Sequence, residues 1–197
     1  MTSMRLLPAG GLTLSAGFEL PPTEDCPWMA VAMREVGTKE KRGAGDNPQV
    51  VKYLKSCDTR FFGSAAEQNH DETSWCSCFV NWCLGQVGIA GTKHPRARSW
   101  LRWGLGRRIP GPRFGAIAVL TRSSDHSLAE TGKGHVAFLW QEIGESLYLL
   151  GGNQSDAVKI QPYKKSNLLM YLWPAQPVLP RGPGGLLTPP SSPFPLN

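Results

Sequence analysis

An α+β fold with an antiparallel sheet is the class that the order of patterns along this chain predicts. Apolar residues at helical spacing occupy the first half, and short apolar runs bounded by turn residues occupy the second half. Helices followed by strands are typical of α+β domains, whereas alternating strands and helices would indicate a parallel sheet. Of the 197 residues, 41% are hydrophobic and 18% are charged, which is typical of a globular chain.

Three helices are expected in the first half. The first covers residues 26–36, with Asp25 as its N-cap and a proline in its first turn. The second covers residues 48–54, with Asn47 as its cap. The third covers residues 75–86 and begins with a Trp-Cys pair. Its buried face is expected to consist of Phe79, Val80, Cys83, Leu84 and Val87.

The second half predicts five strands, preceded by a short amphipathic turn or helix over residues 98–103. The strands are expected over residues 115–121, 134–140, 146–150, 157–160 and 168–173. Around them, the composition divides the chain into an N-terminal arm (1–24), one domain (25–173) and a flexible tail (174–197) rich in proline and glycine.

Charge and hydropathy limit the expected partners and location. The net charge is +6, which favours an acidic partner, but no nucleic-acid-binding motif is present. No run reaches the roughly 18 apolar residues of a membrane span, and the N-terminus is a poor secretory signal. We therefore expect synthesis in the cytoplasm, no stable membrane insertion and no nucleic-acid partner. The basic cluster is interpreted as a solvated face or, if it faces a cleft, as a site of attraction for carboxylates; it consists of Arg96, Arg98, Arg102, Arg107 and Arg108.

One of the five cysteines stands out by position. An odd count at irregular spacing does not indicate a disulfide framework. Cys76 lies at the start of the third helix, where the helix dipole and unpaired N–H groups favour a thiolate nucleophile and an oxyanion. Cys78 and Cys83 are interpreted as packing residues. A zinc site formed by these three with His70 is disfavoured, because ligands spaced along one helix do not converge on a tetrahedral ion.

A histidine and an amide complete the candidate site. His135 begins the second strand, and residues 141–145 are expected to form the hairpin loop that follows it. In a hairpin centred near residue 143, His135 lies opposite about residue 151, next to the polar pair Asn153 and Gln154. An amide there would accept the imidazole N–H and aim the other nitrogen at a nucleophile. Asn153 is preferred because it is nearer, although a one-residue slip would reverse this choice.

The motifs together resemble a known family. WCSCFVNWCL, GHVAF and GGNQ resemble the nucleophile helix, the histidine strand and the third-residue turn of papain-like CHAP and NlpC-type cysteine peptidoglycan hydrolases, and the resemblance covers roughly residues 27–173. It implies a nucleophile helix packed on a small antiparallel sheet. It also implies an endopeptidase or amidase that cleaves stem-peptide amide bonds through an acyl-enzyme, without a metal or organic cofactor. Cys76, His135 and Asn153 would be nucleophile, base and orienter. Possible cleft residues are Asp71, Glu72, Trp75 and Gln154.

Several alternatives stay open at this point. The chain departs from the family in its second cysteine, Cys78, and in its flanking segments. A hydrolase of this kind would meet peptidoglycan in the periplasm or cell wall, as a phage lysin or as a secreted, type VI-like antibacterial effector. Its partners would then include a cognate immunity protein or a component of the secretion apparatus. The rival hypotheses are a non-catalytic wall-binding or interaction module on the same fold and a thiol redox or metal protein.

Overall fold

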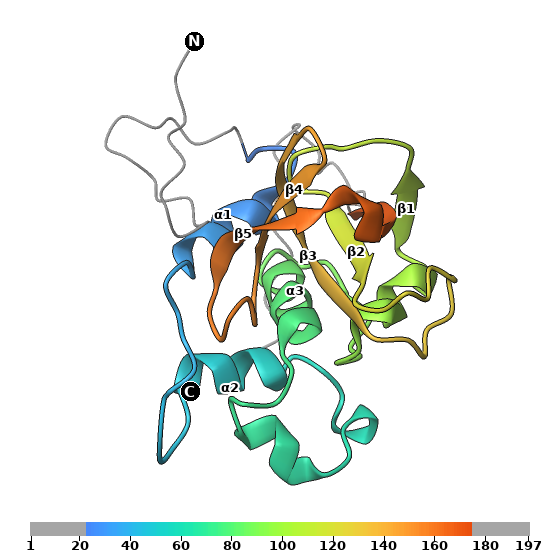
Figure 1. Ribbon diagram of the computed structural model, residues 1–197. Helices are drawn as coiled ribbons and strands as arrows, with labels where there is room; N and C mark the ends of the chain where they lie inside the picture. Colours follow the sequence, from blue (N-terminus) through green and yellow to red (C-terminus); the bar gives the residue numbers. More distant parts are fainter. Residues whose placement is uncertain (1–22, 175–197) are drawn as a thin grey trace, which may run out of the picture.

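The chain folds into helices packed on an antiparallel sheet. Figure 1 shows the computed structural model, which describes residues 23–174. The α+β prediction is confirmed, since the described chain combines three α-helices with a six-stranded antiparallel sheet. The expected arm (1–24) and tail (174–197) lie, apart from their inner ends, outside the described residues.

The helices begin close to the expected positions. The α-helices are α1 (Pro27–Arg34), α2 (Pro48–Leu54) and α3 (Cys76–Gly85), and the short 3-10 helices are η1 (Thr59–Phe61), η2 (Ala65–Asn69), η3 (Ala97–Arg102) and η4 (Lys165–Asn167). Asn47 caps α2 as expected, because its side chain accepts a hydrogen bond from the N–H of Gln49 at 2.8 Å. Cys26 rather than Asp25 occupies the N-cap of α1.

Six strands form a single sheet in the order β1-β6-β2-β3-β4-β5. Their bounds are β1 (Gly106–Ile109), β2 (Ile117–Thr121), β3 (Gly134–Ile143), β4 (Ser146–Gly151), β5 (Lys159–Lys164) and β6 (Leu168–Pro174). The sequence did not indicate β1, because GRRI is not an apolar run. Strand β5 starts and ends later than expected and contains Pro162, which an edge strand tolerates because one side of its backbone is unpaired.

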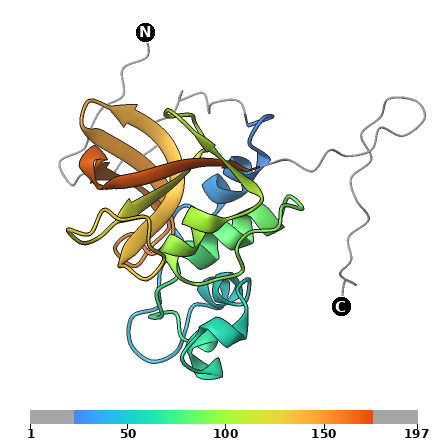
Figure 2. The same ribbon diagram turned by 90° about the vertical axis from the view of Figure 1, so that its right-hand side faces the viewer.

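Helix α3 is the element that places the candidate nucleophile against the sheet. It lies against β3 and β4, with α1 beside it and α2, η1 and η2 beyond its other side (Figures 1 and 2). Nearly all of its side chains are buried, and Phe79 meets Phe138 of β3 edge to face with ring centroids 6.5 Å apart. Burial on all sides fixes both the rotation and the depth of its first residue.

Polar contacts fix the helices further. Ser77 of α3 donates to the carbonyl of His94 at 2.7 Å and accepts from the indole of Trp100 at 2.8 Å. Helix α1 is attached by the indole of Trp28, which donates to the carbonyl of Gly115 at 2.8 Å. Among residues 23–174, no helix is both long enough and apolar enough to cross a membrane.

Candidate active site

Cys76 is the first residue of α3 and lies at the base of a cavity. Its side chain is almost fully buried, and it contributes to the lining of a cavity of about 770 Å³ together with Thr73 and Ser74. The backbone N–H of Val136 donates a hydrogen bond to the Cys76 sulfur. Because Val136 directly follows His135, the structure brings the predicted nucleophile and the predicted base to neighbouring positions.

The state of this thiol differs from the one expected. Burial raises the pKa of Cys76, and this effect outweighs the opposing effects of the Val136 N–H, the Arg122 charge and the N–H of Ser77. The N–H group at the helix start therefore acts in the expected direction, but burial outweighs it. In the resting protein the side chain is a neutral thiol, so it requires a base to become a nucleophile.

His135 lies on β3, paired with Leu120 of β2, and it is completely buried. Its Nε2 lies 3.0 Å from Gln154 Oε1 and 3.2 Å from the hydroxyl of Tyr163, whose ring stacks on the imidazole with centroids 4.9 Å apart. Burial, reinforced by the charge of Arg122, lowers the pKa of His135 to about 3. The imidazole is therefore neutral at physiological pH.

Gln154, and not Asn153, is the amide beside His135. The side-chain N–H groups of Gln154 donate to the carbonyls of Leu149 (3.0 Å) and Lys159. With its donors used in this way, its Oε1 faces His135 and must accept, so the neutral imidazole carries its proton on Nε2. The lone pair of His135 is then on Nδ1, so this is the nitrogen that would have to act as the base.

The preference for Asn153 failed because strand β4 ends before the position opposite His135. The turn lies at residues 144–145, beyond the assumed centre, and Phe138 pairs with Leu150, a register that would place residue 153 opposite His135 if β4 continued. Strand β4 then ends at Gly151, and Asn153 adopts a left-handed conformation with a φ of 53°. The chain reverses there, so the next side chain is the one that points inward.

Two further residues at the site were not anticipated. Arg122 directly follows β2, and its Nη2 lies 3.3 Å from His135 Nδ1. The sequence contained a signal for Arg122, because antiparallel pairing of β2 with β3 places the residue after β2 next to the start of β3. In the structure, the N–H of Arg122 donates to the carbonyl of Lys133 at 3.0 Å. Tyr163 comes from β5, which is separated from β3 by β4 in the sheet, so its contact with His135 joins distant segments that local patterns do not relate.

The expected cleft residues are mostly structural. Asp71 is buried, and its carboxylate accepts from the backbone N–H groups of Lys41 and Asn47 at 2.7 Å each. Glu72 is exposed and does not line the cavity that holds Cys76. Trp75 is fully buried, with its indole donating to Glu40 Oε1 at 2.7 Å. None of these three residues lines the cavity that contains Cys76.

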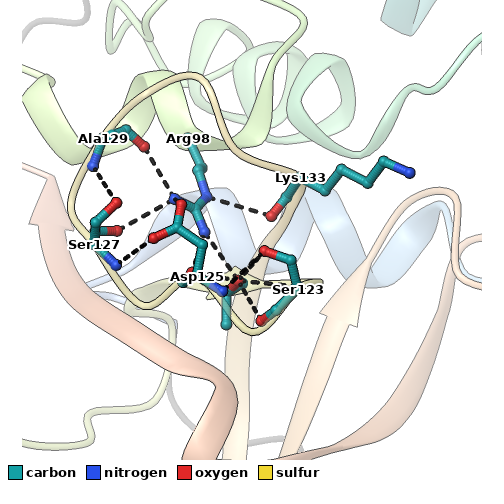
Figure 3. A network of polar contacts seen from close by, with 7 residues as sticks. Arg98, Ser123, Asp125, Ser127, Ala129 and Lys133 are labelled. Atoms are coloured by element: carbon teal, nitrogen blue, oxygen red, sulfur yellow. Dashed lines mark hydrogen bonds and ion pairs between the residues drawn. The ribbon is translucent and has the colours of Figure 1, made fainter.

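One member of the basic cluster is buried, contrary to the interpretation as a solvated face. Figure 3 shows the guanidinium of Arg98 inside the loop of residues 122–133, which joins β2 to β3. All its nitrogens donate to this loop or to the end of β2; the acceptors are the carbonyls of Asp125, Ser127, Ala129 and Lys133, the Asp125 carboxylate and the Thr121 hydroxyl. Arg98 thereby fixes the segment between Arg122 and His135.

The remaining cysteines offer little chemistry at this site. All five cysteines are buried free thiols, and Cys78 and Cys83 point into the core with no exposed surface. Contact with Cys57 raises the pKa of Cys78, and burial raises that of Cys83. Across residues 23–174, no group of three His, Cys, Asp or Glu side chains is placed to hold a metal ion.

The charge of Arg122 acts on both the Cys76 thiol and the oriented, neutral imidazole of His135, so the two groups belong to one region of the structure. Such a pair can perform nucleophilic chemistry if the imidazole takes the thiol proton. Comparisons with protein-family models and with curated proteins find no match for this chain. The chemistry of the site therefore has to be argued from its own residues.

Proposed function

We propose that this protein is a papain-like cysteine hydrolase that cleaves amide bonds in the stem peptides of peptidoglycan. The observation that carries the proposal is the orientation of His135, whose Nε2–H is held by Gln154 while Arg122, whose charge also acts on Cys76, lies at its Nδ1. An amide-oriented histidine next to a cysteine at a helix start is the arrangement that thiol-dependent amide hydrolysis needs. The resemblance of the sequence motifs to CHAP and NlpC-type enzymes supports the same assignment.

The proposed reaction uses only groups on this chain and water. His135 Nδ1 takes the proton from Cys76 Sγ as the sulfur attacks the amide carbonyl carbon. The C–N bond then breaks, and the imidazolium transfers the proton to the leaving amine, which leaves a thioester on Cys76. Water, deprotonated by His135, hydrolyses the thioester to a carboxylic acid and regenerates the thiol. Gln154 holds the required tautomer throughout.

The chemistry of the cavity supports an acidic peptide as substrate. Basic side chains from Arg96, Arg122 and Lys133 line the cavity that contains Cys76, against one carboxylate from Glu67. Aromatic and apolar residues, including Phe61 and Phe62, form another part of its wall. Stem peptides carry free carboxylates and short aliphatic groups. We propose action in the periplasm or cell wall, as a lysin or as an antibacterial effector with a cognate immunity protein.

A non-catalytic binding module on the same fold is the second candidate, and two observations favour it. The pKa of Cys76 is raised, and the Nδ1 lone pair of His135 is occupied by Arg122. The products formed from sacculi separate the two hypotheses. Muropeptide release that requires Cys76 supports the enzyme, and binding of sacculi without release supports the module.

The decisive test is the release of fragments from purified sacculi. The wild-type protein should release muropeptides, and mass spectrometry of these products identifies the bond. Cys76→Ser should reduce the rate by at least about 10³-fold, because a neutral hydroxyl is a much weaker nucleophile in this position. Cys83→Ser, on the same helix but outside the cavity, is the matched control and should stay active where it folds. Equal activity in wild type and Cys76→Ser would refute the assignment.

A further inference from the structure

Arg122 is shared by the linings of two cavities at the candidate site. It lines the cavity that contains Cys76, and it also lines a neighbouring cavity of about 450 Å³ whose wall includes His135, Tyr163 and Asn167. Its Nη2 lies 3.3 Å from His135 Nδ1. The side chain is exposed, so a molecule entering either cavity meets its guanidinium.

The contact between Arg122 and His135 uses the lone pair that catalysis requires. A guanidinium is a donor only, so Arg122 donates and Nδ1 accepts. The other ring nitrogen is already held by Gln154 and lies against the Tyr163 hydroxyl. In this arrangement His135 has no free lone pair with which to take the Cys76 proton. A productive site therefore requires that the Arg122 donor turn to another acceptor.

Arg122 also differs from its neighbours in charge pairing. Arg98 and Arg102 form ion pairs with Asp125 and Glu130 at 3.1 and 2.8 Å. No carboxylate of residues 23–174 forms an ion pair with Arg122, and the cavity that contains His135 is lined by no acidic side chain. Its charge is thus left for a ligand, and a carboxylate is the group that a guanidinium pairs with in two parallel hydrogen bonds.

We propose that Arg122 is a specificity-determining residue that binds a carboxylate of the substrate peptide, and that this pairing releases Nδ1 of His135 for proton transfer from Cys76. The inference rests on the proposed function and adds a requirement for an acidic substrate. The electrostatics act in the same direction, because the charge of Arg122 lowers the pKa of His135. A bound carboxylate neutralises that charge and makes the imidazole a stronger base. An amidated substrate would leave Arg122 on the histidine.

Binding to the Cys76→Ala protein tests this without relying on turnover. The probes are purified muropeptides and the same muropeptides after carbodiimide amidation of their carboxylates, titrated by calorimetry. The free acids should bind about 10- to 100-fold more tightly, the ratio expected for charge-assisted hydrogen bonds. Adding Arg122→Gln should reduce the ratio to about 2-fold or less, and Arg122→Lys should restore part of it. Arg108→Gln, which removes an exposed charge from β1 outside both cavities, should leave it unchanged.

The outcomes separate this inference from the proposed function. Three results would overturn the role of Arg122. They are a preference for free acids that survives Arg122→Gln, equal binding of acid and amide, and no binding of the free acids. If the preference depends on Arg122 but the wild type releases nothing from sacculi, carboxylate recognition stands and the hydrolase assignment fails. In an active enzyme, Arg122→Gln should raise KM for free acids by about 10-fold or more and leave KM for amidated substrates within about 2-fold.

Discussion

Replacing Arg98 by methionine should destabilise the protein far more than any exposed arginine does. Its side chain has no exposed surface, and its guanidinium donates to six acceptor atoms on β2 and the 122–133 loop (Figure 3). Methionine has a similar length but no donor. The loop carbonyls that accept from Arg98 would then face an apolar side chain.

The magnitude follows from these contacts. Each hydrogen bond contributes a net of about 0.5–1.5 kcal/mol, so six correspond to about 3–9 kcal/mol. Part of this is recovered, because Ser127 and Ala129 lie on an exposed loop whose carbonyls can bond to water once the loop opens, and the Asp125 carboxylate is already 47% exposed. We therefore expect Arg98→Met to lower the free energy of unfolding by about 3–5 kcal/mol.

Urea denaturation measures the loss, and amide hydrogen exchange locates it. Exchange should increase most over residues 122–133, because these residues lose their anchor, and the loop carries Arg122 at its start. Gly132 belongs to the same packing, since a Cβ there would lie 2.5 Å from Arg98 Cζ. Arg98→Lys should keep at most about half of the contribution, because one ammonium cannot reach acceptors spread around the loop.

Arg102→Met is the matched control. It lies on the same helix η3 and contacts the same loop through Glu130 at 2.8 Å, but its side chain is 75% exposed. An exposed pair of this kind contributes about 0–1 kcal/mol. If Arg98→Met lost less than about 1 kcal/mol, or no more than Arg102→Met, the role assigned to the buried guanidinium would be wrong.

Two further predictions concern the histidine. The folded-state pKa of His135, about 3, lies below its unfolded value of about 6.5, so only the unfolded chain takes up this proton between those values. The contribution of this group to the free energy of unfolding is therefore complete above pH 6.5 and decreases below it by up to about 1.4 kcal/mol per pH unit. Urea titrations should show that the free energy of unfolding depends less steeply on pH between pH 6 and 4 in His135→Gln than in the wild type. An unchanged pH dependence would contradict the burial argument. Gln154→Ala should lower kcat by about 10²- to 10⁴-fold, because the imidazole of His135 is no longer held in the tautomer with its proton on Nε2. Asn153→Ala should change kcat by about 3-fold or less. The reverse ranking would restore Asn153 as the orienter.

Local patterns were sufficient for the elements that carry the two central residues. The helix that begins at Cys76 follows from apolar residues spaced over a few helical turns. The strand that begins at Gly134 follows from a short apolar run. Because helices preceded strands, the α+β class followed as well. Strand β1 was missed, since GRRI becomes a strand only through its pairing with β6, far away in the sequence.

Tertiary structure decided which side chains form the site and in which state. The end of β4 at Gly151 and the left-handed conformation of Asn153 selected Gln154, one residue away from the sequence-based choice. Arg98 is the buried member of the basic cluster, and burial keeps Cys76 a neutral thiol. Periodicity is encoded by neighbours in the chain, so the sequence by itself determined the elements. Register and desolvation depend on residues distant in the chain, so only the folded structure determined the partners of His135.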